Sequence, residues 1–331
     1  MSVFFAALAS AVLATNAPQT VSNLLAEKTG LSAPVINTND PVENEYYKIL
    51  LADDAAEKDV INWTDDAQAI ARGGEEAKLT LRSRVKKRLD DIRWLYDDFV
   101  QRHPKHVNAR LAYGSFLNDT HDEEGAVAQW EEARKLAPTN AATWNNLANY
   151  YGHRGPVTNA FAYYAKAIEL DPKESVYYHN LAVTVYLYRP DARNFYHLTE
   201  QQVFDKSLDL YREAIKLAPD DFVLYSDYAE SFYGTNPPRW LDGLHAWTEA
   251  LKIAHDEDER QGVYIHLARI NLKLGNFEAA RDRLEAVTNT AYEPIRKKIA
   301  SNLKEAMAAT ATNSPVVPSD ASTKSGSADN P

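Results

Sequence analysis

The residues that could carry out chemistry are nine histidines and several acidic doublets, and the chain has no cysteine. Without a thiol there can be no disulfide, no thiolate metal site and no cysteine nucleophile. The doublets, such as Asp53-Asp54 and Asp97-Asp98, lack the alternating ligands and the glycine of a calcium loop. The histidines are scattered, and a metal site would need several of them to converge. These patterns favour exposed surface charge over a metal centre.

Catalytic motifs are also missing from the sequence, which contains no Gly-rich phosphate loop, no HExxH and no GxSxG. We therefore predict that the protein is not an enzyme and that it holds no cofactor and no metal. The alternative is an enzyme that uses the rest of the chain as a substrate platform. Its active segment would then lie in residues 43–74, which match no recognisable motif.

The charge balance limits the classes of partner. The 331 residues include 36 basic and 47 acidic side chains, a net charge of −11. Such a surface repels phosphates, so we expect no nucleic-acid partner and no broad docking on anionic membranes. One basic run stands out, RSRVKKR at residues 82–88. It is interpreted as a solvated helix face, with a docking patch for an acidic partner as the alternative.

The N-terminus resembles an export signal. The apolar run at residues 3–14 is too short to span a bilayer but has the length of a signal-peptide core, although no basic residue precedes it. We predict a signal peptide at residues 1–17, a flexible spacer at 18–42, and export to the periplasm or the exterior. The alternative is a cytoplasmic protein whose apolar run packs as a helix. No transmembrane span is expected.

The elements that must position any site are repeated. Pro104, Pro138 and Pro172 lie 34 residues apart and close the similar phrases FVQRHP, ARKLAP and AIELDP, and a fourth phrase, AIKLAP, ends at Pro219. Between Pro138 and Pro172, two helical patterns flank Gly155-Pro156. Small and aromatic residues recur on one face of each helix, which lets two helices approach closely. These repeat positions are Trp144, Leu147, Ala148, Tyr151, Ala160, Tyr164, Ala167 and Pro172.

This period and order of residues resemble the tetratricopeptide repeat (TPR) family. The resemblance implies an all-α fold, an α-solenoid in which antiparallel helix pairs form a right-handed superhelix whose groove is lined by the first helix of each pair. We assign five repeats, at residues 107–140, 141–174, 175–221, 222–260 and 261–290. The third repeat carries 13 extra residues within 189–202, where Thr199 and Gln202 are typical of a capping box.

Helical caps are expected at both ends of the array. The N-terminal cap at residues 43–106 should contain one long helix at 75–102, preceded by two shorter helices near 45–51 and 60–70. A C-terminal capping helix is expected at 291–309. The tail at 310–331 contains no aromatic residue, so we expect it to be disordered.

The groove is the candidate functional site. The first helices carry Asn145, Asn146 and Asn149 in the second repeat, His179 and Asn180 in the third, and Asp227 and His266 in the next two. The resemblance implies that a file of such amides, exposed to the groove, pairs with the backbone of an extended peptide. The alternative is that these residues only satisfy neighbouring helix ends. Leu111, Asn145, Val223 and Asp227 occupy the places where chaperone-binding members carry bases, so no carboxylate clamp is expected.

These observations predict a scaffold that binds a protein or an extended peptide in its groove. The alternative within the same fold is an assembly or structural protein of the cell envelope.

Overall fold

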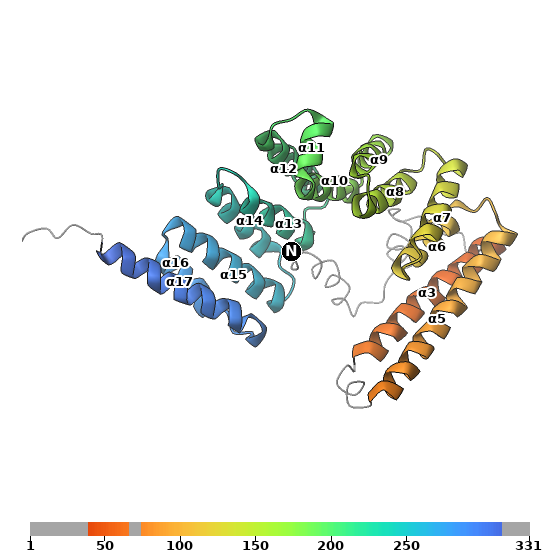
Figure 1. Ribbon diagram of the computed structural model, residues 1–331, viewed down its shortest axis with the longest axis horizontal. Helices are drawn as coiled ribbons and strands as arrows, with labels where there is room; N and C mark the ends of the chain where they lie inside the picture. Colours follow the sequence, from red (N-terminus) through yellow and green to blue (C-terminus); the bar gives the residue numbers. More distant parts are fainter. Residues whose placement is uncertain (1–38, 66–73, 313–331) are drawn as a thin grey trace, which may run out of the picture. The chain divides into compact units, whose positions relative to one another are not determined.

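The computed structural model describes residues 39–65 and 74–312, and these residues form helices and no strand (Figure 1). The chain divides into two compact units, Met1–Ser231 and Phe232–Pro331, called unit 1 and unit 2 below. The expected signal peptide, most of the expected spacer and the tail from residue 313 lie outside the described residues. A bilayer-spanning segment would need a longer apolar stretch than any helix of the described residues provides.

The first described elements of unit 1 are two long helices packed together, α3 (Pro41–Asp65) and α5 (Gly74–Arg102), called the hairpin below. Three packed helix pairs follow. They are α6 (Val107–Asp119) with α7 (Glu123–Leu136), α8 (Ala141–Arg154) with α9 (Val157–Leu170), and α10 (Ser175–Leu187) with α12 (Glu200–Leu217). The short helix α11 (Arg189–Tyr196) is inserted in the third pair, and α13 (Phe222–Ser231) ends the unit.

The N-terminal cap differs from its expected form, because α3 is one helix of 25 residues where two short helices were predicted. No glycine or proline interrupts residues 52–59. Tyr46, Leu50, Asp53 and Ala56 also form a single buried stripe along α3. This stripe continues into the stretch where the break was expected, so one helix packs there and the break that we predicted is absent.

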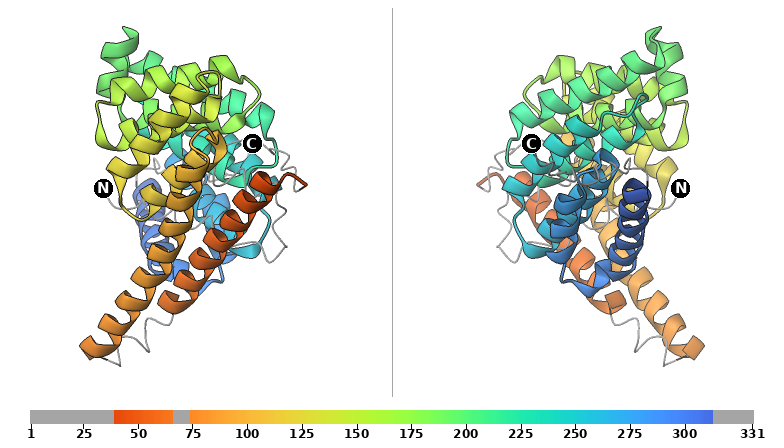
Figure 2. Two further views of the ribbon diagram at one scale, coloured as in Figure 1. Left: turned by 90° about the vertical axis from the view of Figure 1, so that its right-hand side faces the viewer. Right: turned by 90° about the vertical axis from the view of Figure 1, so that its left-hand side faces the viewer.

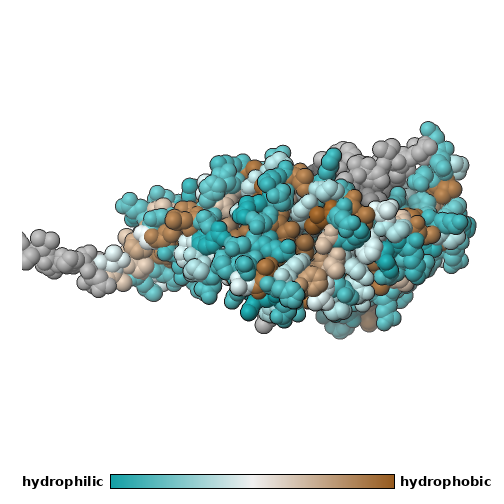
Figure 3. Space-filling model, turned by 90° about the horizontal axis from the view of Figure 1, so that it is seen from above, coloured by the Kyte–Doolittle hydropathy of each residue, from teal (hydrophilic) through white to brown (hydrophobic). Residues whose placement is uncertain are grey.

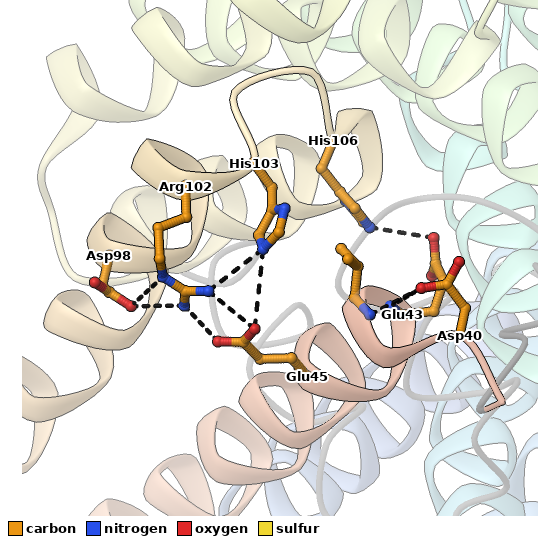
Figure 4. Close-up of polar contacts among 8 residues, drawn as sticks. Asp40, Glu43, Glu45, Asp98, Arg102, His103 and His106 are labelled. Atoms are coloured by element: carbon orange, nitrogen blue, oxygen red, sulfur yellow. Dashed lines mark hydrogen bonds and ion pairs between the residues drawn. The ribbon is translucent and has the colours of Figure 1, made fainter.

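The corner between the hairpin and the first repeat holds a polar cluster (Figure 4). Arg102 forms ion pairs with Glu45 and Asp98, and Nε2 of His106 lies 3.3 Å from Oε1 of Glu43. His106 also caps α6, since its Nδ1 accepts a hydrogen bond from the backbone N–H of Ala109 at 3.0 Å. These contacts fix the start of α3 against the start of α6.

The helix pairs close on small residues, as the pair of α8 and α9 shows. Leu147, Ala148, Ala160 and Ala167 are fully buried, and Tyr164 is nearly so. The ring of Tyr163 meets those of Trp144 and Tyr151 edge-on, with centroids 5.2 and 5.5 Å apart. Alanine therefore sets the closeness of the two helices, and half-buried aromatic rings fill their flanks.

The insert in the third repeat folds as α11 and a short link to α12. Ala192 is fully buried, and α11 packs against α9 and α12. The predicted capping box is confirmed, because the Thr199 hydroxyl accepts from the backbone N–H of Gln202 and the Gln202 side chain accepts from the backbone N–H of Thr199.

Unit 2 contains η1 (Phe232–Gly234), α14 (Trp240–Ile253), α15 (Glu257–Leu274), α16 (Phe277–Glu285), η2 (Thr290–Tyr292) and α17 (Glu293–Thr312). The unit boundary falls inside the expected fourth repeat, and α15 begins four residues before the expected start of the fifth. The Asp256 carboxylate caps α15 by accepting from the backbone N–H of Glu259, and acidic residues occupy the first turn. The last helix continues to Thr312, beyond the expected residue 309.

Candidate functional site

The first helices of the repeats in unit 1, α6, α8, α10 and α13, pack side by side in sequence order. We call the surface that they form the first-helix face. Each helix starts at a side-chain cap, provided by His106, Asn140, Glu174 and Asp221 respectively. The caps and the side-by-side packing of these helices bring equivalent residues of successive helices next to one another.

An amide network joins α8 to α10. Nδ2 of Asn180 donates to Oδ1 of Asn145 at 3.0 Å, and Nδ2 of Asn145 donates to Oδ1 of Asn146 at 3.5 Å. Asn145 and Asn146 are only 3% and 6% exposed. The expectation that Asn145 and Asn146 lie exposed in a groove is therefore wrong. A first helix is covered by its own partner and by the first helices beside it, so α8 buries polar and apolar positions alike.

The next link joins α10 to α13. Nε2 of His179 lies 2.8 Å from Oδ2 of Asp227, and both side chains are partly buried. The ring of Tyr211 lies 5.8 Å from that of His179, centroid to centroid. The two links follow one rule. The residue at the Asn145 position of one repeat pairs with the residue at the Asn146 position of the next repeat.

This rule explains where the network ends. Asn146 should pair with the residue at the Asn145 position of the preceding repeat, which is Leu111. Leu111 is fully buried and its side chain cannot form a hydrogen bond. Nδ2 of Asn146 is accordingly a buried donor with no hydrogen-bond partner. Burying an amide donor without a partner costs about 1–3 kcal/mol.

Two of the predicted site residues, Asn149 and His266, form contacts outside the amide network. Oδ1 of Asn149 accepts a hydrogen bond from the Tyr164 hydroxyl at 2.6 Å, within the pair of α8 and α9. Burial raises the pKa of Tyr164, so the hydroxyl keeps its proton and remains a donor. Asn149 therefore holds its own repeat together and does not belong to the network between repeats.

His266 lies in unit 2, where its ring packs against other aromatic side chains. Its ring stacks on that of Trp247 with centroids 3.9 Å apart, and its Nδ1 lies 3.0 Å from the Tyr233 hydroxyl. Burial, followed by the charge of Arg269, lowers the pKa of His266 to about 3. The imidazole is therefore neutral at physiological pH.

The sequence interpretation overlooked Ser226 on α13. Its hydroxyl oxygen is buried and has no hydrogen-bond partner, like Nδ2 of Asn146. Ser226 holds the same repeat position as Asn145 and His179, one residue before Asp227. Aligning the residue that precedes each predicted site residue would have identified it.

A carboxylate clamp would need basic side chains at four positions of the first-helix face. These positions hold Leu111, Asn145, Val223 and Asp227, and Val223 is partly exposed. Within residues 39–65 and 74–312, no three acidic or histidine side chains converge closely enough to hold a metal ion. The surface seen in Figure 3 shows hydrophobic side chains in separate small patches among hydrophilic ones.

Comparisons with known proteins agree with this architecture. The sequence profile of the tetratricopeptide repeat family matches residues 141–174, the second repeat. No curated protein matches the chain significantly in sequence.

Two solved structures share the fold. One is PilW, described as a widely conserved type IV pilus biogenesis factor, with 15% identity, a TM-score of 0.51, and coverage of 73% of this chain and 98% of PilW. The other is the C-terminal part of a TPR repeat-containing protein from Cytophaga hutchinsonii, with 12% identity, a TM-score of 0.50, and coverage of 77% and 99%. They confirm the predicted fold class, an all-α solenoid of antiparallel helix pairs. The second repeat is therefore a tetratricopeptide repeat, and the described residues share the all-α solenoid fold of these two structures.

Proposed function

We propose that the protein is a non-catalytic scaffold that binds another protein, through an extended peptide segment, on the first-helix face of unit 1. The observation that carries the proposal is the unpaired Nδ2 of Asn146, at the point where the amide network stops against Leu111. The donor is buried in this structure, so a peptide carbonyl that supplies its missing acceptor must displace the side chains that cover it. Asn145 and Asn180 hold the Asn146 side chain in place before binding.

The absence of catalysis is part of the same proposal. The enzyme alternative placed its active segment in residues 43–74, and residues 43–65 of that range belong to α3. The buried carboxylate of this segment, Asp53, accepts a hydrogen bond from the Tyr96 hydroxyl at 2.8 Å. This contact packs α3 against α5, which supports a structural role for the segment. Export through residues 1–17 stays a prediction.

Replacing Asn146 by leucine separates binding from stability. The change removes the unpaired donor of Asn146 but also the acceptor for Nδ2 of Asn145, so the two effects oppose each other and the free energy of unfolding should change by less than about 1 kcal/mol. The same change should weaken a bound peptide about tenfold, since the lost hydrogen bond is worth roughly 1.4 kcal/mol. The measurements are urea unfolding and the affinity of peptides selected on the full chain from a displayed random library.

Asn194→Leu is the matched control, because Asn194 is exposed on α11. It should leave peptide affinity unchanged. Peptides that bind the Asn146→Leu protein as tightly as the original chain would contradict the proposed site.

A further inference from the structure

The helix α5 is much longer than the repeat helix beside it. It has 29 residues against 13 in α6, or about 43 Å against about 20 Å at roughly 1.5 Å per residue. The first turns of α5 extend past α6 and α7 (Figures 1 and 2). The buried residues of α5 accordingly begin only at Ile92. The first half of the helix therefore lacks the cover that α6 gives to its second half.

A groove with a volume of about 470 Å³ lies beside the first half of α5, at the end of α6. Its apolar lining consists of Leu81, Val85 and Leu89 on α5 and Phe116 near the end of α6. The three α5 residues are spaced by four and form one stripe about 12 Å long. We call this surface the α5 groove. Its apolar length equals two helical turns, which is the spacing of the anchors that a docked helix presents.

Bases line one flank of the stripe. Arg82, Lys86 and Arg93 border the α5 groove together with a single acid, Asp90, which gives the lining a net charge of +2. Lys86 pairs with Asp90, both with well-exposed side chains, and Arg93 pairs with Asp122, both with half-buried side chains. Arg82 has no ion-pair partner in the described part of the chain. This local positive charge is unusual in a protein whose net charge is −11.

We propose that the α5 groove binds an acidic amphipathic helix of a partner protein. The α5 groove is open where α6 ends, and its apolar stripe matches the apolar face of an amphipathic helix. The basic flank selects acidic residues beside that face. This surface shares no residue with the amide network of the first-helix face, so it is a second docking site.

Charge reversal on the flank tests the proposal. Helix-forming peptides would be selected from a displayed library on the full chain, and their affinities measured for the Arg82→Glu, Lys86→Glu double variant. We expect peptides with apolar residues at i, i+4 and i+7 and an excess of acids, and a loss of affinity of about tenfold or more in the variant. Binding should also weaken as salt is added.

Two controls locate the effect. Lys58→Glu with Lys87→Glu changes the net charge equally, at exposed side chains outside the α5 groove, and should leave affinity unchanged. Asn146→Leu should also leave it unchanged, so failure of the α5 groove is distinguishable from failure of the first-helix site.

Several outcomes would overturn the proposal. One is a selection that yields no acidic helix, and another is a set of peptides that bind the double variant as tightly as the original chain. A third is self-association of the chain that the double variant abolishes, because the occupant would then be a second copy. Binding of the chain to phosphatidylglycerol vesicles that depends on Arg82 and Lys86 would assign the surface to a membrane instead.

Discussion

Replacing Gly114 by alanine is expected to destabilise unit 1 by about 1–3 kcal/mol, although alanine is the better helix former. A Cβ built at Gly114 would lie 2.3 Å from Nε1 of Trp130 and 2.5 Å from its Cδ1. The indole cannot move easily, because it is buried and its N–H donates to the Leu111 carbonyl at 3.2 Å. The added methyl group must therefore push α6 and α7 apart. Thermal or urea unfolding measures the change.

Gly152 provides the matched control, since it is also buried in a first helix. A Cβ there would have its nearest neighbours, in Ala160 and Thr184, at 3.9 Å, which is ordinary contact. Gly152→Ala should stabilise the protein by about 0.5–1 kcal/mol, the difference in helix propensity. If both variants shift the unfolding midpoint in the same direction, the indole of Trp130 does not close on Gly114 and α6 does not pack on α7 in this register.

Acidification from pH 7 to pH 5 is expected to reduce the free energy of unfolding of unit 2 by about 1–2 kcal/mol, mostly through His266. Its pKa falls from an ordinary 6.5 to about 3 in the folded protein, because the charged imidazolium would be buried against Trp247. A folded-state pKa below the unfolded value gives stability that is complete above pH 6.5. This stability is lost as the pH falls from 6.5 towards 3, because the unfolded chain then binds the proton.

The test compares the pH dependence of unfolding in His266→Gln and His245→Gln proteins. His245 is exposed on α14, so its removal should preserve the slope between pH 7 and pH 5. His266→Gln should flatten the slope, whatever it does to the stability at pH 7. An unchanged slope in the His266→Gln protein would show that this histidine is not buried in its neutral form.

Much of the fold could be predicted from local patterns. The alanines on facing helices and the box at Thr199 and Gln202 each depend on residues within one repeat, and the 34-residue spacing of the prolines shows where each repeat ends. The unit boundary after Ser231 and the single helix α3 could not be predicted in the same way. Both depend on which distant surfaces pack together, and the pattern within a single helix does not contain that information.

The arrangement of the candidate site also depends on packing between helices, which the pattern within a single helix does not reveal. The sequence identified Asn145, Asn146 and Asn180 as special but predicted them on an exposed surface. The burial of Asn145 and Asn146 follows from the packing of α8 between neighbouring first helices. The pairing of Asn145 with Asn180 crosses two repeats, so a face assigned from one helix cannot reveal it. Only the register between repeats shows that the network stops at Leu111.

The side-chain amide resonances of asparagine test the central claim most directly. In a protein labelled with ¹⁵N at asparagine, addition of a selected peptide should shift the Nδ2 resonance of Asn146 strongly downfield, as its donor gains an acceptor. The resonances of Asn194 and Asn302, both exposed and far along the sequence from α8, should stay in place. A peptide that binds the chain tightly and leaves the Asn146 resonance unmoved would contradict binding on the first-helix face.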